Sequence, residues 1–310
     1  MFAAGLENPP KISIVTPSFN QASFLEATID SVLSQRYPNL EYIIIDGGST
    51  DGSVEIIKKY EKHLAYWVSE PDRGQYEAIN KGFAHSTGEI LAWINSDDMY
   101  QSFAFRTVAS IFTELPQVEW LTTLSPAFWD WYGFSLGYCT FTGFAREAFL
   151  DGYMFPPGYK GARGTPQQES TFWRRSLWEK AGSRVRTEFK LAGDFDLWSQ
   201  FYRHADLYTT PSPLGGFRYQ DKNRSLSFDD YVQEAERSLE EMRKSVGLSN
   251  TIFKKMKTIL RKIILRLYIY RIPGISVLTK PILDYQGLRI VRQKRNTPQG
   301  YWEIEMYKFQ

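Results

Sequence analysis

The chain has 310 residues, of which 43% are hydrophobic and 16% aromatic, and its formal net charge is +2. A chain of this length and composition can bury a sizeable core as one large domain, or as one domain with an appendage, which excludes disorder throughout. Its single cysteine, Cys139, excludes an intrachain disulfide and any site with several cysteine ligands, and it favours a reducing compartment.

No targeting or membrane-spanning segment is expected from the sequence. Residues 1–8 contain no basic region followed by a long apolar stretch, which a signal peptide requires. No run of 18 uncharged apolar residues occurs, which a transmembrane helix would require. We therefore expect a cytoplasmic protein.

The first hundred residues alternate between strand and helix patterns. Short apolar runs predict strands at residues 12–16, 42–45, 66–69 and 90–94. Apolar residues at helical spacing predict a helix after each of the first three strands, at residues 25–33, 54–60 and 75–85. This order predicts an α/β domain whose mostly parallel central sheet is flanked by helices.

Polar side chains follow each predicted strand, at residues 17–20, 46–51, 70–74 and 95–98. In open parallel sheets, ligands bind beyond the carboxyl ends of the strands. We therefore expect these four segments to form one site. The alternative for the second segment is a simple turn followed by a helix cap, because Asp, Gly and Ser are the common turn residues.

The sharpest feature is the pair Asp97 and Asp98, which follows the predicted strand at residues 90–94. Two adjacent carboxylates repel each other unless a cation or hydrogen-bond donors offset their charge. Mg²⁺ and Mn²⁺ take carboxylate oxygens, and Mg²⁺ is often held by one or two carboxylates together with substrate phosphates. We therefore predict a divalent cation here, with positions left open for a diphosphate. The alternative without a functional role is a surface turn with two solvated acids.

The sequence lacks both glycine motifs that commonly bind nucleotides, G-x-G-x-x-G after the first strand and G-x-x-x-x-G-K-S/T. A bound nucleotide must then be held by acids, aromatic side chains and a metal ion. A further acid, Asp194, lies near the start of a predicted helix that carries Leu197, Trp198 and Phe201. It is either a helix cap or a general base in a cleft, and both interpretations stay open on sequence alone.

Aromatic residues are concentrated at residues 127–159, where 12 occur in 33 positions. Aromatic faces stack well on apolar C–H surfaces, including those of sugars. Ordinary hydrophobic core explains such a segment equally well. Residues 152–166 contain seven Gly and Pro residues, so a mobile loop is expected there.

Six segments together resemble family 2 glycosyltransferases. In chain order they read SIVTPSFN, SQRYPNLEYIIIDGGSTDGS, EPDRGQYEAINKGF, GEILAWINSDD, QQESTFWRRSLWEKAG and AGDFDLW, within residues 11–220. The resemblance implies a GT-A, Rossmann-like fold and an inverting enzyme. It implies a UDP-, GDP- or dTDP-linked sugar as the donor and a saccharide or lipid-linked hydroxyl as the acceptor. It also implies a role in cell-surface polysaccharide or glycolipid synthesis.

The resemblance assigns donor-side residues. Pro17 and Phe19 lie where the family cradles the nucleobase, and Asn20 belongs to the same donor-binding segment. Asp46 matches a residue that binds the base or ribose. Arg73 matches an arginine near the base and the diphosphate.

Asp97 and Asp98 stand in the place of the family's D-x-D motif. The resemblance puts Asp97 nearer the ribose and favours Asp98 as the ligand of Mn²⁺ or Mg²⁺, with Asp97 as a second ligand. This chain reads N-S-D-D instead of D-x-D. Which of the two acids lies nearer the ribose and which binds the metal ion therefore stays open.

The resemblance also assigns acceptor-side residues. Asp194 matches the catalytic base, which would deprotonate the acceptor hydroxyl. Many relatives have Glu-Asp at this place, whereas this chain has Gly193 before Asp194, which leaves one carboxylate. Gln168 and Glu169 match a segment that lines the acceptor side.

We predict a GT-A catalytic domain at residues 10–245, with a nucleotide-sugar half at 10–100 and an acceptor half at 101–245. A sugar-nucleotidyltransferase is an alternative, but residues 17–20 lack the Gly- and Arg-rich loop that it would carry after the first strand. A non-catalytic carbohydrate-binding protein of the same fold is another alternative. Such a protein has no need of four acids at strand ends.

A basic amphipathic extension is predicted at residues 246–310. Residues 251–296 hold 12 basic residues against one acid, a charge of +11, whereas the remainder has 25 basic and 34 acidic residues, a charge of −9. Residues 252–268 form one apolar and one basic face at helical spacing. This helix either packs on the catalytic domain or lies on an anionic membrane, which would place the protein at the inner face of the cytoplasmic membrane. Nucleic acid is not expected as a partner, because the tail shows no base-stacking arrangement of aromatic residues.

Overall fold

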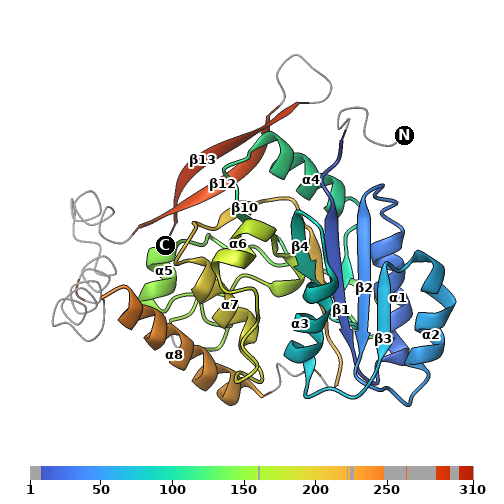
Figure 1. The fold of residues 1–310 in the computed structure, drawn as a ribbon. Coiled ribbons are helices and arrows are strands. Elements are labelled where there is room, and N and C mark those ends of the chain that lie inside the picture. Colours follow the sequence, from blue (N-terminus) through green and yellow to red (C-terminus); the bar gives the residue numbers. More distant parts are fainter. Residues whose placement is uncertain are drawn as a thin grey trace.

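The computed structural model describes residues 8–159, 161–221, 223, 227–247, 263, 284–293 and 300–309 (Figure 1). The large sheet contains β1 (Ile12–Ser18), β2 (Leu40–Asp46), β3 (Tyr66–Ser69), β4 (Ile90–Trp93), β6 (Trp120–Thr123), β9 (Phe172–Arg174), β10 (Tyr208–Thr210), β12 (Tyr285–Gln293) and β13 (Tyr301–Phe309). Their order across the sheet is β13-β12-β10-β6-β9-β4-β1-β2-β3. A small sheet has the order β5-β11-β7-β8, with β5 (Met99–Tyr100), β7 (Ala127–Trp129), β8 (Ser135–Tyr138) and β11 (Gly215–Arg218).

The first four strands confirm those predicted from the apolar runs. They are parallel and lie in the order β4-β1-β2-β3, with Ile12 of β1 opposite both Leu40 and Ile90. β1 and β4 are completely buried and β2 nearly so, which explains their almost continuous apolar sequences. Because the strands are parallel, the polar segments that follow them all emerge at one edge of the sheet.

Helices cover both faces of the large sheet (Figure 1). Side chains alternate along each strand, so that Tyr42 and Ile44 of β2 point to one face while Ile43 and Ile45 point to the other. The first face is covered by α1 (Ala22–Leu33), α2 (Ser53–Tyr60) and α4 (Ala104–Glu114). The second is covered by α3 (Gln75–His85), α5 (Arg146–Asp151), α6 (Arg175–Lys180), α7 (Gly193–Phe201) and α8 (Phe228–Ser245). The predicted α/β class is therefore confirmed.

The last strands belong to the large sheet, which the sequence interpretation missed. β12 pairs in parallel with β10, and β13 pairs with β12 in an antiparallel hairpin. The hairpin packs on α4, where the Trp302 indole N–H donates to Ser110 Oγ (2.7 Å) and Arg292 forms an ion pair with Glu114 (3.1 Å). The extension predicted at residues 246–310 is therefore not separate over its whole length. The predicted amphipathic helix at 252–268 lies outside the described residues, apart from Ile263.

The aromatic-rich segment at residues 127–159 divides between core and surface. Phe144, Phe149 and Phe155 are each 1% exposed and pack in the core beneath α7 and α8. Tyr132 and Phe134 are 80% and 71% exposed, in the turn between β7 and β8. Ordinary core therefore accounts for only part of this segment. Among the helices in the described ranges, none is both long and apolar enough to cross a membrane.

Candidate functional site

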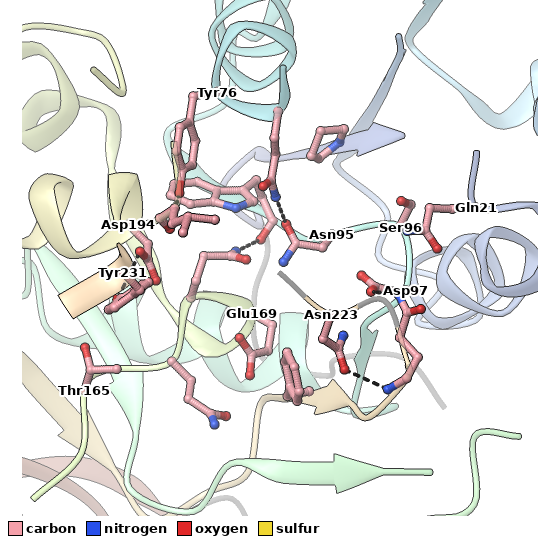
Figure 2. Close-up of a pocket in the computed structure, with 18 of the residues that line it drawn as sticks. Gln21, Tyr76, Asn95, Ser96, Asp97, Thr165, Glu169, Asp194, Asn223 and Tyr231 are labelled. Carbon is pink, nitrogen blue, oxygen red and sulfur yellow. Dashed lines mark hydrogen bonds between the residues drawn. The ribbon is translucent and has the colours of Figure 1, made fainter. Parts of the chain in front are cut away.

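A cavity of about 880 Å³ lies at the carboxyl ends of β1, β2 and β4 (Figure 2). Each of the four polar segments predicted to form one site contributes to its lining, through Pro17–Phe19, Gly47, Asp72 with Gly74, and Asn95–Asp97. The rest of the lining comes from the later part of the chain, including η2 (Gln168–Ser170), α7 and the segment after β11. The cavity therefore joins the two predicted halves of the catalytic domain.

Asp97 and Asp98 occupy different environments. Asp97 lines the cavity, and its Oδ2 accepts a hydrogen bond from the side-chain amide of Gln220 (2.8 Å). Asp98 is 1% exposed and lies behind the lining. Its Oδ1 accepts from the backbone N–H of Arg218 (2.9 Å) and its Oδ2 from the side-chain amide of Asn95 (3.1 Å). Asp97 therefore faces the cavity, whereas Asp98 lies behind it with one protein donor on each oxygen. The assignment of Asp98 and Asp97 as metal ligands stays a prediction.

The carboxyl groups of Asp97, Asp98 and Glu169 influence one another's protonation. Burial raises the pKa of Asp98 well above its usual value, and the charges of Asp97 and Glu169 raise it further. Burial also raises the pKa of Asp97, although the Gln220 hydrogen bond opposes this. Burial raises the pKa of Glu169 to about 7, with contributions from Asp194 and Asp97. The site therefore concentrates negative charge that a bound cation would offset.

Arg218 and Gln220, from the end of β11 and just beyond it, hold the Asp97–Asp98 turn. Besides its backbone bond to Asp98, Arg218 donates from Nε to the Asp97 carbonyl oxygen (2.7 Å) and from Nη1 to that of Trp131 (3.0 Å). Neither Arg218 nor Gln220 was predicted. Nothing local in the sequence marks them, because their partners in the Asp97–Asp98 turn lie more than a hundred residues earlier in the chain.

Asp194 lies in the first turn of α7, whose cap residue is Ala192. The structure therefore does not support a cap role for Asp194. The carboxylate instead lines the cavity, and the hydroxyl of Tyr231 donates a hydrogen bond to its Oδ1 (3.3 Å; Figure 2). Burial raises the pKa of Tyr231 well above its usual value, and the charge of Asp194 adds to this increase. Tyr231 therefore remains protonated and available as a donor at neutral pH.

The residue before Asp194 is glycine for a steric reason. The Gly193 N–H donates to the hydroxyl of Tyr76 (2.9 Å), which itself donates to the carbonyl of Leu191 (2.6 Å). A Cβ atom on Gly193 would lie 2.5 Å from the Tyr76 ring. A glutamate cannot occupy this position unless Tyr76 moves. The packing of Tyr76 against Gly193 therefore explains why Asp194 is not preceded by a second acid.

Gln168 and Glu169 both line the cavity and are 6% and 5% exposed. The side-chain amide of Gln168 donates to the carbonyl of Trp93 at the end of β4. Among the described residues, the Oε1 atoms of Gln168 and Glu169 are buried without a hydrogen-bond partner. A buried acceptor without a partner is costly. Because these two atoms have almost no exposed surface, a ligand donor can reach them only if the side chains move.

Asp46 is buried at the end of β2 and organises the loops around it. Its carboxylate accepts hydrogen bonds from the backbone N–H groups of Gly48 and Ser49 and from the hydroxyls of Ser49 and Ser69. Asp46 does not line the cavity, although Gly47 does. The geometry gives Asp46 a positioning role, and its predicted contact with base or ribose stays a prediction.

The other predicted donor-side residues differ in their placement. Pro17 and Phe19 line the cavity, and Phe19 is 59% exposed. Asn20 does not line it; its Oδ1 accepts from the Thr50 N–H (2.9 Å) and so joins two loops. The Arg73 side chain is 85% exposed, is ion-paired with Glu77 (2.9 Å) and also lies outside the cavity.

The donor set fits a divalent cation that is shared with a substrate. Within the described ranges, no three carboxylate, imidazole or thiol side chains are arranged to chelate a metal ion. Asp97 can supply one or two oxygens, and Mg²⁺-type ions commonly take their remaining ligands from phosphates and water.

The sequence that forms the strand ends of this site is similar to a known protein family. Residues 13–124 match the model of glycosyl transferase family 2. The resemblance to family 2 glycosyltransferases is therefore confirmed over this part of the chain. Over 96 residues it is 43% identical to an uncharacterized glycosyltransferase of Mycobacterium tuberculosis. That match covers 31% of this chain and spans only 37% of the relative's length.

Two solved structures share the fold of this chain. Staphylococcus aureus TarS, residues 1–349 in complex with UDP-GlcNAc, has a TM-score of 0.59 at 15% identity, over 88% of this chain and 78% of TarS. The mannosyltransferase PcManGT of Pyrobaculum calidifontis, in complex with GDP-Man and Mn²⁺, has a TM-score of 0.54 at 15% identity, over 89% and 85% of the two chains. The predicted GT-A fold is therefore confirmed.

Proposed function

We propose that the protein is an inverting glycosyltransferase that moves a sugar from a nucleoside-diphosphate sugar to a hydroxyl acceptor. The observation that carries this proposal is that Asp97 and Asp194, from different halves of the domain, line one cavity. In the view of Figure 2 they lie on two sides of Glu169, whose pKa is raised by both of their charges. The arrangement provides an acid for the donor side and an acid for the acceptor side.

The donor occupies the part of the cavity formed by the strand ends. Pro17 and Phe19 offer apolar surface to a nucleobase, and Asp97, which also lines the cavity, is proposed to face the diphosphate. The TarS structure is a complex with UDP-GlcNAc and the PcManGT structure is a complex with GDP-Man, which supports a nucleotide-sugar donor for this chain as well.

The proposed reaction uses Mn²⁺ or Mg²⁺. The Mn²⁺ in the PcManGT complex and the fit of Asp97 support this. When bound, the ion would stabilise the negative charge that develops on the departing nucleoside diphosphate. Gln220 holds the Asp97 carboxylate, and Arg218 and Asn95 hold Asp98 behind it, so the protein keeps the acidic turn in a fixed position.

Asp194 acts as the general base on the acceptor side. It takes the proton from the acceptor hydroxyl as that oxygen attacks the anomeric carbon on the face opposite the departing diphosphate, which inverts the configuration. Tyr231 orients the carboxylate by donating to its Oδ1. A carboxylate in this role typically contributes a factor of ~10²–10⁴ to the rate.

The biological setting is cell-surface polysaccharide or glycolipid synthesis, as the family resemblance implies. Attachment to the inner face of the cytoplasmic membrane belongs to the same proposal. It is supported by the charge of +11 on residues 251–296, because basic residues on an amphipathic helix attract anionic headgroups.

The test is a screen of nucleotide-sugar cleavage. The full-length protein is incubated with Mn²⁺ and UDP-, GDP- or dTDP-linked sugars, and the released nucleoside diphosphate is measured. We expect release with one nucleotide class and its loss when EDTA removes the metal. The anomeric configuration of the product, read by proton NMR, should be opposite to that of the donor. Absence of release with every donor would contradict the proposed activity, and a retained configuration would contradict inversion.

A further inference from the structure

The base segment, which we define as residues 190–194 at the start of α7, carries Asp194 and has no side-chain cap of its own. The cap residue is Ala192, whose side chain cannot accept a hydrogen bond. The first backbone N–H groups of a helix have no partner within that helix and need acceptors from elsewhere. In this segment the acceptors come from two other helices, α3 and α8.

Glu234 of α8 accepts most of these hydrogen bonds. Its Oε2 accepts from the backbone N–H groups of Lys190 (2.9 Å), Leu191 (2.8 Å) and Ala192 (2.9 Å). Its Oε1 lies 2.8 Å from the same Lys190 nitrogen, so that N–H is shared between both oxygens. A carboxylate is favoured here because the N-terminus of a helix carries partial positive charge and because consecutive N–H groups form a concave site for an anion.

The same face of α8 also reaches the base itself. Tyr231, three residues before Glu234, donates to Asp194 Oδ1 (3.3 Å), and residues three apart on a helix are neighbours on its surface. From α3, the Tyr76 hydroxyl accepts from the Gly193 N–H (2.9 Å). In Figure 2 Asp194 lies between Tyr76 and Tyr231. Glu234 itself does not line the cavity, so it can influence the reaction only through the base segment that it holds.

α8 makes a second attachment to α7 that does not include the base. The Ser238 hydroxyl lies 2.7 Å from Asp196 Oδ1 and 3.0 Å from Ser199 Oγ. Asp196 is buried, is ion-paired with Arg186 and does not line the cavity. The contact between the two helices therefore has one part that holds the base segment and another part that stabilises the helix pair away from the base.

We propose that Glu234 is a positioning residue for the catalytic base: its carboxylate fixes residues 190–192 and thereby the direction in which Asp194 faces the acceptor hydroxyl. This inference rests on the proposed function, because it takes Asp194 as the base. A displacement of about 1 Å in a reacting group can cost about a hundredfold in rate. Loss of Glu234 should lower turnover without weakening nucleotide binding, because the proposed nucleotide contacts come from the strand ends and not from α7 or α8.

Steady-state kinetics of nucleotide release, with the preferred donor and Mn²⁺, test the inference on the full-length protein. Glu234→Ala should lower kcat about 10- to 100-fold and leave KM for the donor within about twofold of the wild type. Glu234→Gln, which keeps an acceptor oxygen, should show a smaller fall in kcat, and it provides the test if the alanine variant does not fold. Ser238→Ala is the matched control. It should lower the free energy of unfolding but keep kcat within about twofold.

A double variant separates positioning of the base from a general loss of structure. If Glu234 acts through Asp194, the double variant Asp194→Asn/Glu234→Ala should be no slower than Asp194→Asn alone, because residues that act as a unit have non-additive effects. A further fall of about tenfold in the double variant, wild-type kcat in both Glu234 variants, or an equal fall in Ser238→Ala would overturn the inference while the proposed function stands. Near-normal turnover in Asp194→Asn would instead overturn the assignment of the base, and the inference with it.

Discussion

The side-chain amide of Gln220 donates a hydrogen bond to the carboxylate of Asp97, with 2.8 Å between Nε2 and Oδ2. Asp97 follows β4 in the predicted nucleotide-sugar half, whereas Gln220 follows β11 in the predicted acceptor half. The residue between Arg218 and Gln220 is Tyr219, which lines the same cavity. One short segment therefore orients the Asp97 carboxylate and also lines the cavity.

This relationship predicts the effect of Gln220→Ala. Without its donor, the Asp97 carboxylate is less well oriented, so the affinity for UDP with Mn²⁺ should fall about fivefold, the equivalent of one hydrogen bond. Calorimetric titration of UDP with and without Mn²⁺ measures this. Gln233→Ala on the exposed face of α8 is the matched control and should bind like the wild type. Equal affinity for Gln220→Ala and the wild type would show that the bond does not matter for metal-dependent binding.

Replacement of Asp97 by alanine and replacement of Asp98 by alanine should have different effects. Asp97→Ala should remove the Mn²⁺-dependent part of UDP affinity without much loss of stability, because Asp97 lines the cavity. Asp98→Ala leaves the Arg218 N–H and the Asn95 amide without their acceptor, so the free energy of unfolding should fall by about 2 kcal/mol or more. Urea unfolding and UDP titration of both variants check this. A stable Asp98→Ala protein that has lost the metal response would identify Asp98 as the principal ligand.

The raised pKa of Glu169 should make the stability of the folded protein depend on pH. Its pKa is about 7 in the folded protein against an ordinary value of 4.5, so the folded state binds more protons in this range. The contribution of this group to stability is therefore fully present below about pH 4.5 and is lost as the pH rises through about 7. The loss is on the order of 1–3 kcal/mol.

Urea unfolding of the wild type and of Glu169→Gln in EDTA, from about pH 5 to about pH 8, measures this loss. The stability of the wild type should decline relative to that of the variant as the pH rises. If the two stability curves run parallel across the range, Glu169 titrates with an ordinary pKa and the account of its environment is contradicted.

Membrane binding by the basic residues of 251–296 must be tested without disturbing the large sheet. Deletion of residues 246–310 would remove β12 and β13, and two of the twelve basic residues, Arg289 and Arg292, are ion-paired with Glu305 and Glu114. Replacement by glutamine is therefore limited to six residues: Lys254, Lys255, Lys257, Arg261, Lys262 and Arg266. The wild type should co-sediment with vesicles that contain anionic lipid.

The six-fold variant should stay in solution, since each basic residue near such a surface contributes about 1 kcal/mol. Replacement of the exposed Lys58 and Lys62 by glutamine controls for the loss of charge elsewhere and should leave sedimentation unchanged. Equal sedimentation of the wild type and the six-fold variant would show that these residues do not attach the protein to a membrane.

The parts that could be predicted from the sequence are those decided by local pattern. β1 to β4 were predictable because buried apolar runs end at residues such as Gly47 and Asp97, and parallel strands bring such ends together. Asp98 was harder to interpret, because its partner Arg218 is set by tertiary pairing between β11 and the turn after β4.

The strands β12 and β13 were missed for a different reason. Their apolar and aromatic residues, such as Ile290 and Trp302, alternate with charged ones, which is typical of strands, but the arginines of β12 are equally typical of an exposed basic segment. In the fold, Arg289 is paired with Glu305 across the hairpin. The net charge of a terminal segment therefore does not by itself predict an exposed surface, because its basic residues can be paired with acids in the fold.

The central claim is that Asp194 is the base of a glycosyl transfer from a nucleotide sugar, and the turnover of Asp194→Asn tests it most directly. Nucleotide release is measured with the preferred donor and Mn²⁺, beside calorimetric titration of UDP or GDP. Asp229→Asn, at an exposed acid in the first turn of α8, is the matched control. The account predicts a fall in turnover of ~10²–10⁴-fold for Asp194→Asn, with nucleotide affinity within about twofold of the wild type and no change in the control. Near-normal turnover in Asp194→Asn would contradict it.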